Sequence, residues 1–205
     1  MARAFTQRHL LLATHNPGKV REFEDLLQPT GVVLQTRDDL PEPEETGATF
    51  LENARLKAEA AVAATGQPAL ADDSGLEVHG LDGAPGIHSA RWAGAPRDFA
   101  PAMARIEREL VDRFGSLEAA DRHCAFVAVL VLAWPDGHVE VAEGRLEGTL
   151  VFPPRGAGGF GYDPIVQPLG ETRTCAELSA KEKAAISHRG RAVRALIQRC
   201  WPHVA

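Results

Sequence analysis

The chain has 205 residues, of which 44% are hydrophobic and 24% charged, a composition typical of a globular protein with one sizeable core. Its formal net charge of -6 argues against a general nucleic-acid binder. The apolar run at residues 9–13 is too short for a signal-peptide core or a membrane span, so we expect no membrane contact. The three cysteines Cys124, Cys175 and Cys200 lack metal-ligand spacing, which favours the reducing cytoplasm.

A strand-to-helix turn is predicted near the start of the chain. Residues 9–13 indicate a buried strand, and the apolar residues of 20–27 share one face of a helix. Such a turn directs backbone N–H groups, the positive end of the helix dipole and a lysine toward one place, which suits a phosphate. A plain Asn-Pro-Gly turn with a solvated lysine has the same letters, and the Walker A spacing is absent. The turn residues are Thr14, His15, Asn16, Pro17, Gly18 and Lys19.

A capping box predicts the next long helix, after a short strand at residues 32–34. Thr49 and Glu52 occupy its N-cap and N3 positions, and the glycine after Thr65 is typical of its C-terminal end. Asn53 and Lys57 are four residues apart and therefore share one face of this helix.

Paired carboxylates follow the apolar stretch 68–71, which predicts a buried strand. Asp72, Asp73 and Ser74 would then emerge into a crevice at the carboxyl edge of that strand. Such oxygen-rich sites suit Mg²⁺, although the same letters also fit an Asp-Ser-Gly turn with solvated acids. A second metal ligand could come from the preceding acidic loop, which contains Glu42, Glu44 and Glu45.

The second half of the chain mixes helices with hairpin strands, which favours an α/β fold with a mixed rather than a purely parallel sheet. Residues 80–97 are rich in Gly, Pro and Ala and indicate an ordered loop. A helix follows, with Met103, Ile106 and Leu110 facing inward. Further strands are expected at 124–134, 139–141 and 144–152, a short helix capped by Ser179 and Glu182, and a last helix after Ser187.

The glycine-rich loop 155–163 matches the letters G-x-G-x-x-G without the context of a dinucleotide-binding turn. Pro164 disfavours the helix that such a turn must open. The loop could present Phe160 and Asp163 to a flat ligand, whereas Phe160 and Tyr162 could equally be core aromatics. Farther on, Lys183 precedes His188 and Arg189, two donors at a helix N-terminus that face either an oxygen-rich ligand or solvent.

Together these segments resemble the inosine triphosphate pyrophosphatase family, which removes non-canonical purine nucleoside triphosphates. The resemblance extends over nearly the whole chain, so we expect residues 1–205 to form one such domain. The matching blocks lie at residues 13–19, 44–47, 52–54 with Lys57, 71–76, 83–91, 158–164 and 187–190.

The resemblance implies a long mixed β-sheet flanked by helices, two lobes around a central nucleotide cleft, and a homodimer. It also implies Mg²⁺-dependent hydrolysis of ITP, dITP and XTP to the monophosphate and pyrophosphate. Asp73 would be both metal ligand and water-activating base, with Glu44 favoured over Glu42 and Glu45 as the second ligand. Substrate contacts would come from Thr14, His15, Asn16, Pro17, Gly18, Lys19, Asn53, Lys57 and Ser74. The base pocket would be formed by Phe160, Gly161, Tyr162, Asp163, Lys183, His188 and Arg189.

Two other interpretations remain at this point. A Maf-type nucleotide pyrophosphatase shares the general cleft but lacks the combination of residues 160–163 with Ser-His-Arg. A catalytically silent nucleotide-binding protein would keep Phe160 and His188 and could lose Asp73 or Lys19, both of which are present.

Overall fold

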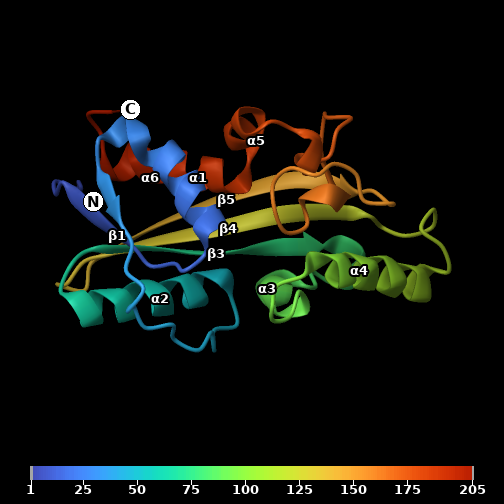
Figure 1. The fold of residues 1–205 in the computed structure, drawn as a ribbon, viewed down its shortest axis with the longest axis horizontal. Helices are drawn as coiled ribbons and strands as arrows, with labels where there is room; N and C mark the ends of the chain where they lie inside the picture. Colours follow the sequence, from blue (N-terminus) through green and yellow to red (C-terminus); the bar gives the residue numbers. More distant parts are fainter. Residues whose placement is uncertain (1, 205) are drawn as a thin grey trace. The chain divides into compact units, whose positions relative to one another are not determined.

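A mixed six-stranded sheet with the order β2-β1-β3-β4-β5-β6 is the centre of the computed structural model, which describes residues 2–204 (Figure 1). β1 pairs in parallel with β2 and β3, whereas β5 and β6 are antiparallel, which confirms the predicted α/β class with a mixed sheet. The strands are β1 His9–Leu12, β2 Val33–Gln35, β3 Ala69–Val78, β4 His123–Ala133, β5 Val139–Leu150 and β6 Val166–Pro168. The helices are α1 Pro17–Leu27, α2 Phe50–Thr65, α3 Ser89–Trp92, α4 Phe99–Phe114, α5 Ala180–Ile186 and α6 His188–Cys200.

The chain forms two compact units, and β3, β4 and β5 each contribute residues to both. Unit 1 contains residues 1–73, 128–144 and 188–205. Unit 2 contains residues 74–127 and 145–187.

Strand periodicity determines the two faces of the sheet in unit 1. Successive side chains of a strand point to opposite faces, so Leu70 packs in a cluster with α1 and α6 while Ala71 packs with α2. Figure 1 shows α1 and α6 on one side of these strands and α2 on the other. The next two residues of β3, Asp72 and Asp73, continue this alternation.

In the core of unit 2, one face of α4 packs on the sheet. Met103, Ile106 and Leu110 of α4 are buried against residues such as Val78 and Phe126, as the helical periodicity predicts.

Several predicted boundaries are wrong. The carboxylates at residues 72 and 73 lie within one continuous strand, β3, because the backbone stays extended through Gly75 and beyond. The two strands expected at 139–141 and 144–152 are one strand, β5. A Cβ at Gly144 would lie 2.1 Å from the His188 carbonyl oxygen, so this glycine permits the close approach of α6. The expected loop 80–97 contains short helical turns and α3, and the strand β6 was not predicted.

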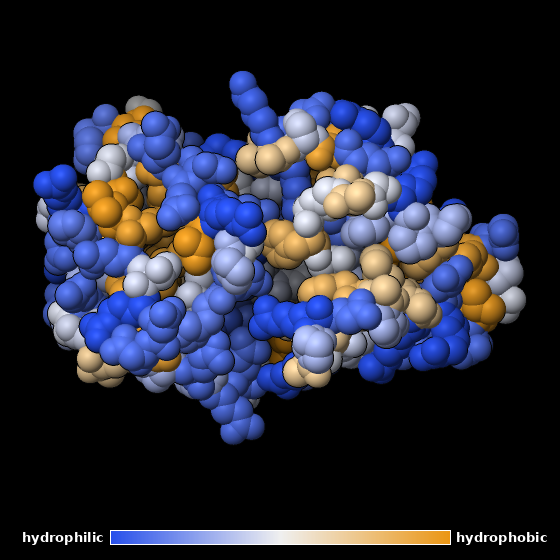
Figure 2. Space-filling model, in the orientation of Figure 1, coloured by the Kyte–Doolittle hydropathy of each residue, from blue (hydrophilic) through white to orange (hydrophobic). Residues whose placement is uncertain are grey.

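The exposed surface is mixed in polarity. On the face drawn in Figure 2 hydrophilic residues predominate, with hydrophobic ones interspersed among them. Among the described residues, no helix has the length and apolar character needed to cross a membrane. The large exposed apolar side chains include Leu51 and Leu56 of α2, Phe160 and Leu169.

The N-cap of α2 provides a test of how local sequence positions this helix. The Thr49 hydroxyl accepts a hydrogen bond from the Glu52 amide at 3.2 Å. Thr49→Ala should therefore lower the free energy of unfolding by about 1 kcal/mol in chemical denaturation. Thr49→Ser keeps the acceptor and is the matched control. Equal stability of the alanine and serine variants would contradict this role for the cap.

Candidate active site

The turn between β1 and α1 is organised by an N-cap. Asn16 Oδ1 accepts hydrogen bonds from the amides of Gly18 at 2.9 Å and Lys19 at 3.3 Å, and α1 begins at Pro17. Two of the amides expected to be open to a phosphate are therefore already bonded within the turn. What the turn still offers a phosphate is the positive end of the helix dipole and the Lys19 ammonium group, which lies beside Asp72.

Asp72 lies in a buried ion cluster on the α1 and α6 face of unit 1. Its Oδ2 is 3.0 Å from Lys19 Nζ, and it accepts hydrogen bonds from Arg189 Nε at 3.1 Å and Nη2 at 2.9 Å. Arg189 also donates to Glu22. Burial raises the pKa of Asp72, but the positive charges of Arg189, Lys19 and Lys57 outweigh it and hold the pKa well below its usual value. Asp72 therefore stays ionised.

Asp73 lies on the opposite face of the same strand, against α2. Its Oδ1 accepts a hydrogen bond from Lys57 Nζ at 2.6 Å, and Lys57 also bonds Glu45 Oε1 at 3.0 Å. Burial is the main reason why the pKa of Asp73 is raised. Within residues 2–204, the buried Oδ2 of Asp73 has no hydrogen-bond partner.

This arrangement fits a divalent cation. An ionised oxygen buried without a partner is costly, and a bound cation would compensate it. Oxygen ligands of this kind suit Mg²⁺, which keeps several waters and takes one or two protein carboxylates.

The acidic loop places its three glutamates in different surroundings. Glu45 reaches Lys57, whereas Glu42 bonds His15 Nδ1 at 2.7 Å. Glu44 is exposed, and its side chain makes no ion pair with any residue that the structure describes. Of the three, Glu45 is thus linked to Asp73 through a shared lysine.

Asn53 supports this loop from α2. Its side chain is fully buried, and Oδ1 accepts a hydrogen bond from the Gly47 amide at 2.8 Å. A Cβ at Gly47 would lie 2.7 Å from that same oxygen, so the contact requires glycine. The expected substrate contact of Asn53 remains a prediction, and the contact observed here positions the acidic loop.

The loop at residues 156–163 in unit 2 is organised around Asp163. This carboxylate is 2% exposed, and its Oδ2 accepts from Lys183 Nζ at 2.6 Å and from the Phe160 amide at 2.8 Å. Gly159 has φ +68°, and a Cβ there would lie 2.0 Å from that oxygen. Phe160 is 38% exposed, with Lys183 Nζ 4.7 Å from its ring centroid. An aromatic face and an ammonium group are therefore held together above a buried carboxylate.

Tyr162 belongs to the core of unit 2. It is 3% exposed, and its hydroxyl donates to the Ser89 carbonyl at 2.9 Å. Any contact of Tyr162 with a base must go through its backbone, as for Gly161. Ser74 also belongs to unit 2, whereas His188 and Arg189 belong to unit 1.

Sequence reasoning missed Glu22, whose carboxylate bonds Arg189. Glu22 follows Lys19 by three residues on α1 and so shares its face, which was the available signal. A contact of Arg189 with the base remains a prediction, but the residue is 1% exposed and its guanidinium is bonded to the carboxylates of Glu22 and Asp72. Its observed contacts hold Asp72.

Comparison with known proteins gives full-length matches. A sequence model of the Ham1 family matches residues 10–199. A dITP/XTP pyrophosphatase of Rhodospirillum centenum is 56% identical, with 97% of this chain and 98% of that protein covered. One of Rhodopseudomonas palustris is 52% identical, with 93% and 95% covered. The solved structure of a HAM1 protein from Coxiella burnetii is 38% identical with a TM-score of 0.85, covering 94% of this chain and 98% of that one.

The ion cluster predicts how stability depends on Asp72. Asp72→Asn removes the buried carboxylate charge that Arg189 and Lys19 share and should lower the free energy of unfolding by about 3–5 kcal/mol. Asp25→Asn, on the exposed side of α1, should change it by less than about 0.5 kcal/mol. Urea denaturation at neutral pH measures both variants, and equal effects would contradict the cluster's role.

The same carboxylate predicts a dependence on acid. Because folding lowers the pKa of Asp72, its contribution is complete above the unfolded value of about 3.9 and is lost as the pH falls from there toward the folded value. The stability lost between neutral and acidic pH should therefore be smaller in Asp72→Asn than in the natural chain. If the free energy of unfolding depended on pH in the same way in both proteins, Asp72 would not be the group that causes the loss of stability in acid.

Proposed function

The chain belongs to the Ham1 family, and on this premise we propose that it hydrolyses dITP, ITP and XTP to the nucleoside monophosphate and pyrophosphate. The observation that carries the proposal is the state of Asp73. One of its oxygens is bonded to a lysine, and the other is buried with no hydrogen-bond partner among residues 2–204. Cleavage between the α- and β-phosphates requires charge neutralisation and a positioned carboxylate, and little else from the protein.

A divalent cation is the usual cofactor of triphosphate chemistry, and we propose Mg²⁺. Asp73 would hold it. Glu44 stays the predicted second ligand, and Glu45 is its main rival because it shares Lys57 with Asp73. When bound, Mg²⁺ supplies neutralisation of the phosphate charge and an anchor for the substrate oxygens.

Asp73 is also proposed as the general base. Its burial raises the pKa above that of a solvated aspartate, which makes the carboxylate a better proton acceptor for an attacking water. Lys57 fixes the orientation of the Asp73 carboxylate through Oδ1 and leaves Oδ2 to accept the proton of the attacking water. Lys19, held beside Asp72 at the start of α1, would contact the phosphates together with the helix dipole.

Base recognition is proposed for the loop anchored by Asp163. Phe160 offers a partly exposed ring on which a purine can stack, and Lys183 offers a donor beside it. A donor suits the 6-oxo group of hypoxanthine and xanthine and does not suit the 6-amino group of adenine. Asp163 would affect the choice of base indirectly, because it holds Phe160 and Lys183 in place. A contact of His188 with the base remains a prediction.

We further propose that the enzyme acts in the cytoplasm as a homodimer. The three cysteines are all free and buried, which supports a reducing compartment. The homodimer follows from the family resemblance, and light scattering of the purified chain tests it directly.

The role of Asp73 can be tested by charge removal. Asp73→Asn keeps the shape and should lower kcat on ITP by about a hundredfold or more, with an unchanged circular dichroism spectrum. Asp38→Asn removes an exposed charge near the acidic loop and should leave kcat unchanged. If Asp73→Asn retained the natural kcat, Asp73 would be neither the base nor an essential ligand.

We propose that Lys19 acts in phosphate binding and Asp163 in base recognition, and measurements of kcat/KM on ITP and ATP test this separation. Lys19→Ala should lower both values by about ten- to a hundredfold, because a phosphate contact carries no information on the base. Lys19→Arg, which keeps the charge, should lower both kcat/KM values by a smaller factor. Asp163→Ala should instead change the ITP-to-ATP ratio by about tenfold or more. If Lys19→Ala and Asp163→Ala changed the ITP-to-ATP ratio equally, the separation of phosphate binding from base recognition would be wrong.

A further inference from the structure

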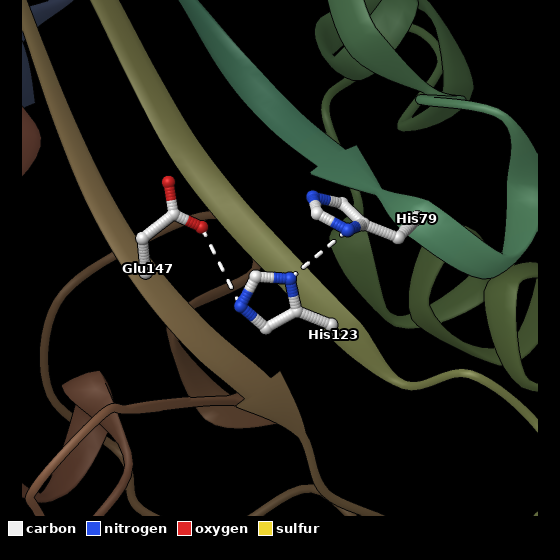
Figure 3. A group of neighbouring side chains, drawn as sticks. All are labelled: His79, His123 and Glu147. Carbon is white, nitrogen blue, oxygen red and sulfur yellow. Dashed lines mark hydrogen bonds and ion pairs between the residues drawn. The ribbon is translucent and has the colours of Figure 1, made fainter.

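Unit 2 contains a second group of metal-ligating side chains, formed by His79, His123 and Glu147. His79 follows the last residue of β3, His123 is the first residue of β4, and Glu147 lies on β5. Because β4 lies between β3 and β5 in the sheet, the end of β3 brings His79 next to His123, and Glu147 lies on the other neighbouring strand. Figure 3 shows the two imidazoles and the carboxylate directed toward one another.

The three side chains already form a continuous chain of polar contacts. His79 Nδ1 lies 3.0 Å from His123 Nδ1, and His123 Nε2 lies 3.6 Å from Glu147 Oε2. One ligand atom from each residue can be chosen so that all three lie within 4.8 Å of one another. His79 is exposed and the other two are partly exposed, so an ion in solvent can reach them.

The facing Nδ1 atoms have the spacing of two ligands of one ion. Nitrogen ligands bind zinc at about 2.0–2.1 Å, which places two of them about 3.3 Å apart in a tetrahedral site. Without a metal, one of the two Nδ1 atoms must carry the proton that they share. A cation can take the place of this proton and accept a lone pair from each Nδ1, provided that the displaced proton is taken up by Nε2 of the same ring.

Glu147 stands on the other side of His123. A carboxylate beside one ring nitrogen favours the proton on that nitrogen and leaves the other as a lone pair, as in many metal sites. Its second oxygen, Oε1, is 3.3 Å from Arg145 Nε, and Arg145 is also bonded to Glu77 at 2.7 Å. The positive charge of Arg145 is thereby shared between two carboxylates.

We propose that His79, His123 and Glu147 form a binding site for a transition-metal dication of the Zn²⁺ type. Imidazole ligands select zinc and its neighbours over Mg²⁺, which prefers oxygen, so this site differs in chemistry from the carboxylates around Asp73. An ion bound here ties the end of β3 to β4 and β5. It therefore stabilises the folded chain in proportion to its occupancy.

The test is a Zn²⁺ titration of the full chain in excess Mg²⁺, which occupies oxygen-rich sites. The natural chain should bind one Zn²⁺ and show a higher melting temperature with it. His79→Ala and His123→Ala should each weaken Zn²⁺ binding by at least about tenfold and abolish the thermal shift, and Glu147→Gln should weaken binding as well. The matched control is His138→Ala, because His138 contacts one carboxylate, Glu140 at 2.8 Å, in unit 1.

Two results would overturn the proposal: no saturable Zn²⁺ binding by the natural chain, or folded histidine variants that bind as tightly as it does. Should the variants fail to fold, Co²⁺ added to the natural chain decides the question. Broadening of the imidazole signals of His79 and His123, without thiolate charge-transfer absorption, supports the site. Broadening confined to other residues, or the appearance of thiolate absorption, contradicts it.

Discussion

Two adjacent aspartates on one strand impose the arrangement of unit 1. A strand sends neighbouring side chains to opposite faces of its sheet, so Asp72 and Asp73 cannot share one set of partners. Burying two carboxylates is costly unless each is compensated. Lys19 and Arg189 compensate Asp72 from α1 and α6, and Lys57 contacts Asp73 from α2. Helices on both faces are therefore needed at this point of β3.

The two aspartates differ in the positive charges that surround them, and this gives them different properties. Asp72 has several positive neighbours that hold its pKa well below the usual value, so it is a permanent charge that orders Lys19 and Arg189. Asp73 has one bonded lysine and a raised pKa, so it retains capacity for a further cation and for a proton. The same strand thus carries, side by side, the ion-paired Asp72 and the carboxylate that we propose to be reactive.

Much of the framework could be predicted from the sequence because its signals are local. The N-cap residues of α2 and α5 are those expected from the sequence, and the inward residues of α4 follow its helical period. The capping box predicted for α2 is only half formed, because the Glu52 carboxylate accepts from the Ala48 amide and not from that of Thr49. The prediction that β3 ends before Asp72 was wrong because Asp-Asp-Ser-Gly has the composition of a turn. Here tertiary ion pairs allow the strand to continue through these residues.

The partners of the site residues were less predictable because they are distant in sequence. Arg189 and Asp72 are 117 residues apart, and no local pattern indicates that they meet. The burial of Tyr162 beneath Ser89 and the link from Lys57 to Glu45 also depend on how the chain folds back. Motifs indicated the candidate site residues, whereas the contacts of these residues could be found only in the structure.

The most direct test of this account is to identify the products formed from ITP, XTP, dITP, ATP and GTP, each with and without Mg²⁺. The account predicts that ITP, XTP and dITP yield the monophosphate and pyrophosphate only when Mg²⁺ is present, and that ATP and GTP are turned over far more slowly. Release of inorganic phosphate and a diphosphate, or equal turnover of ATP and ITP, would contradict it.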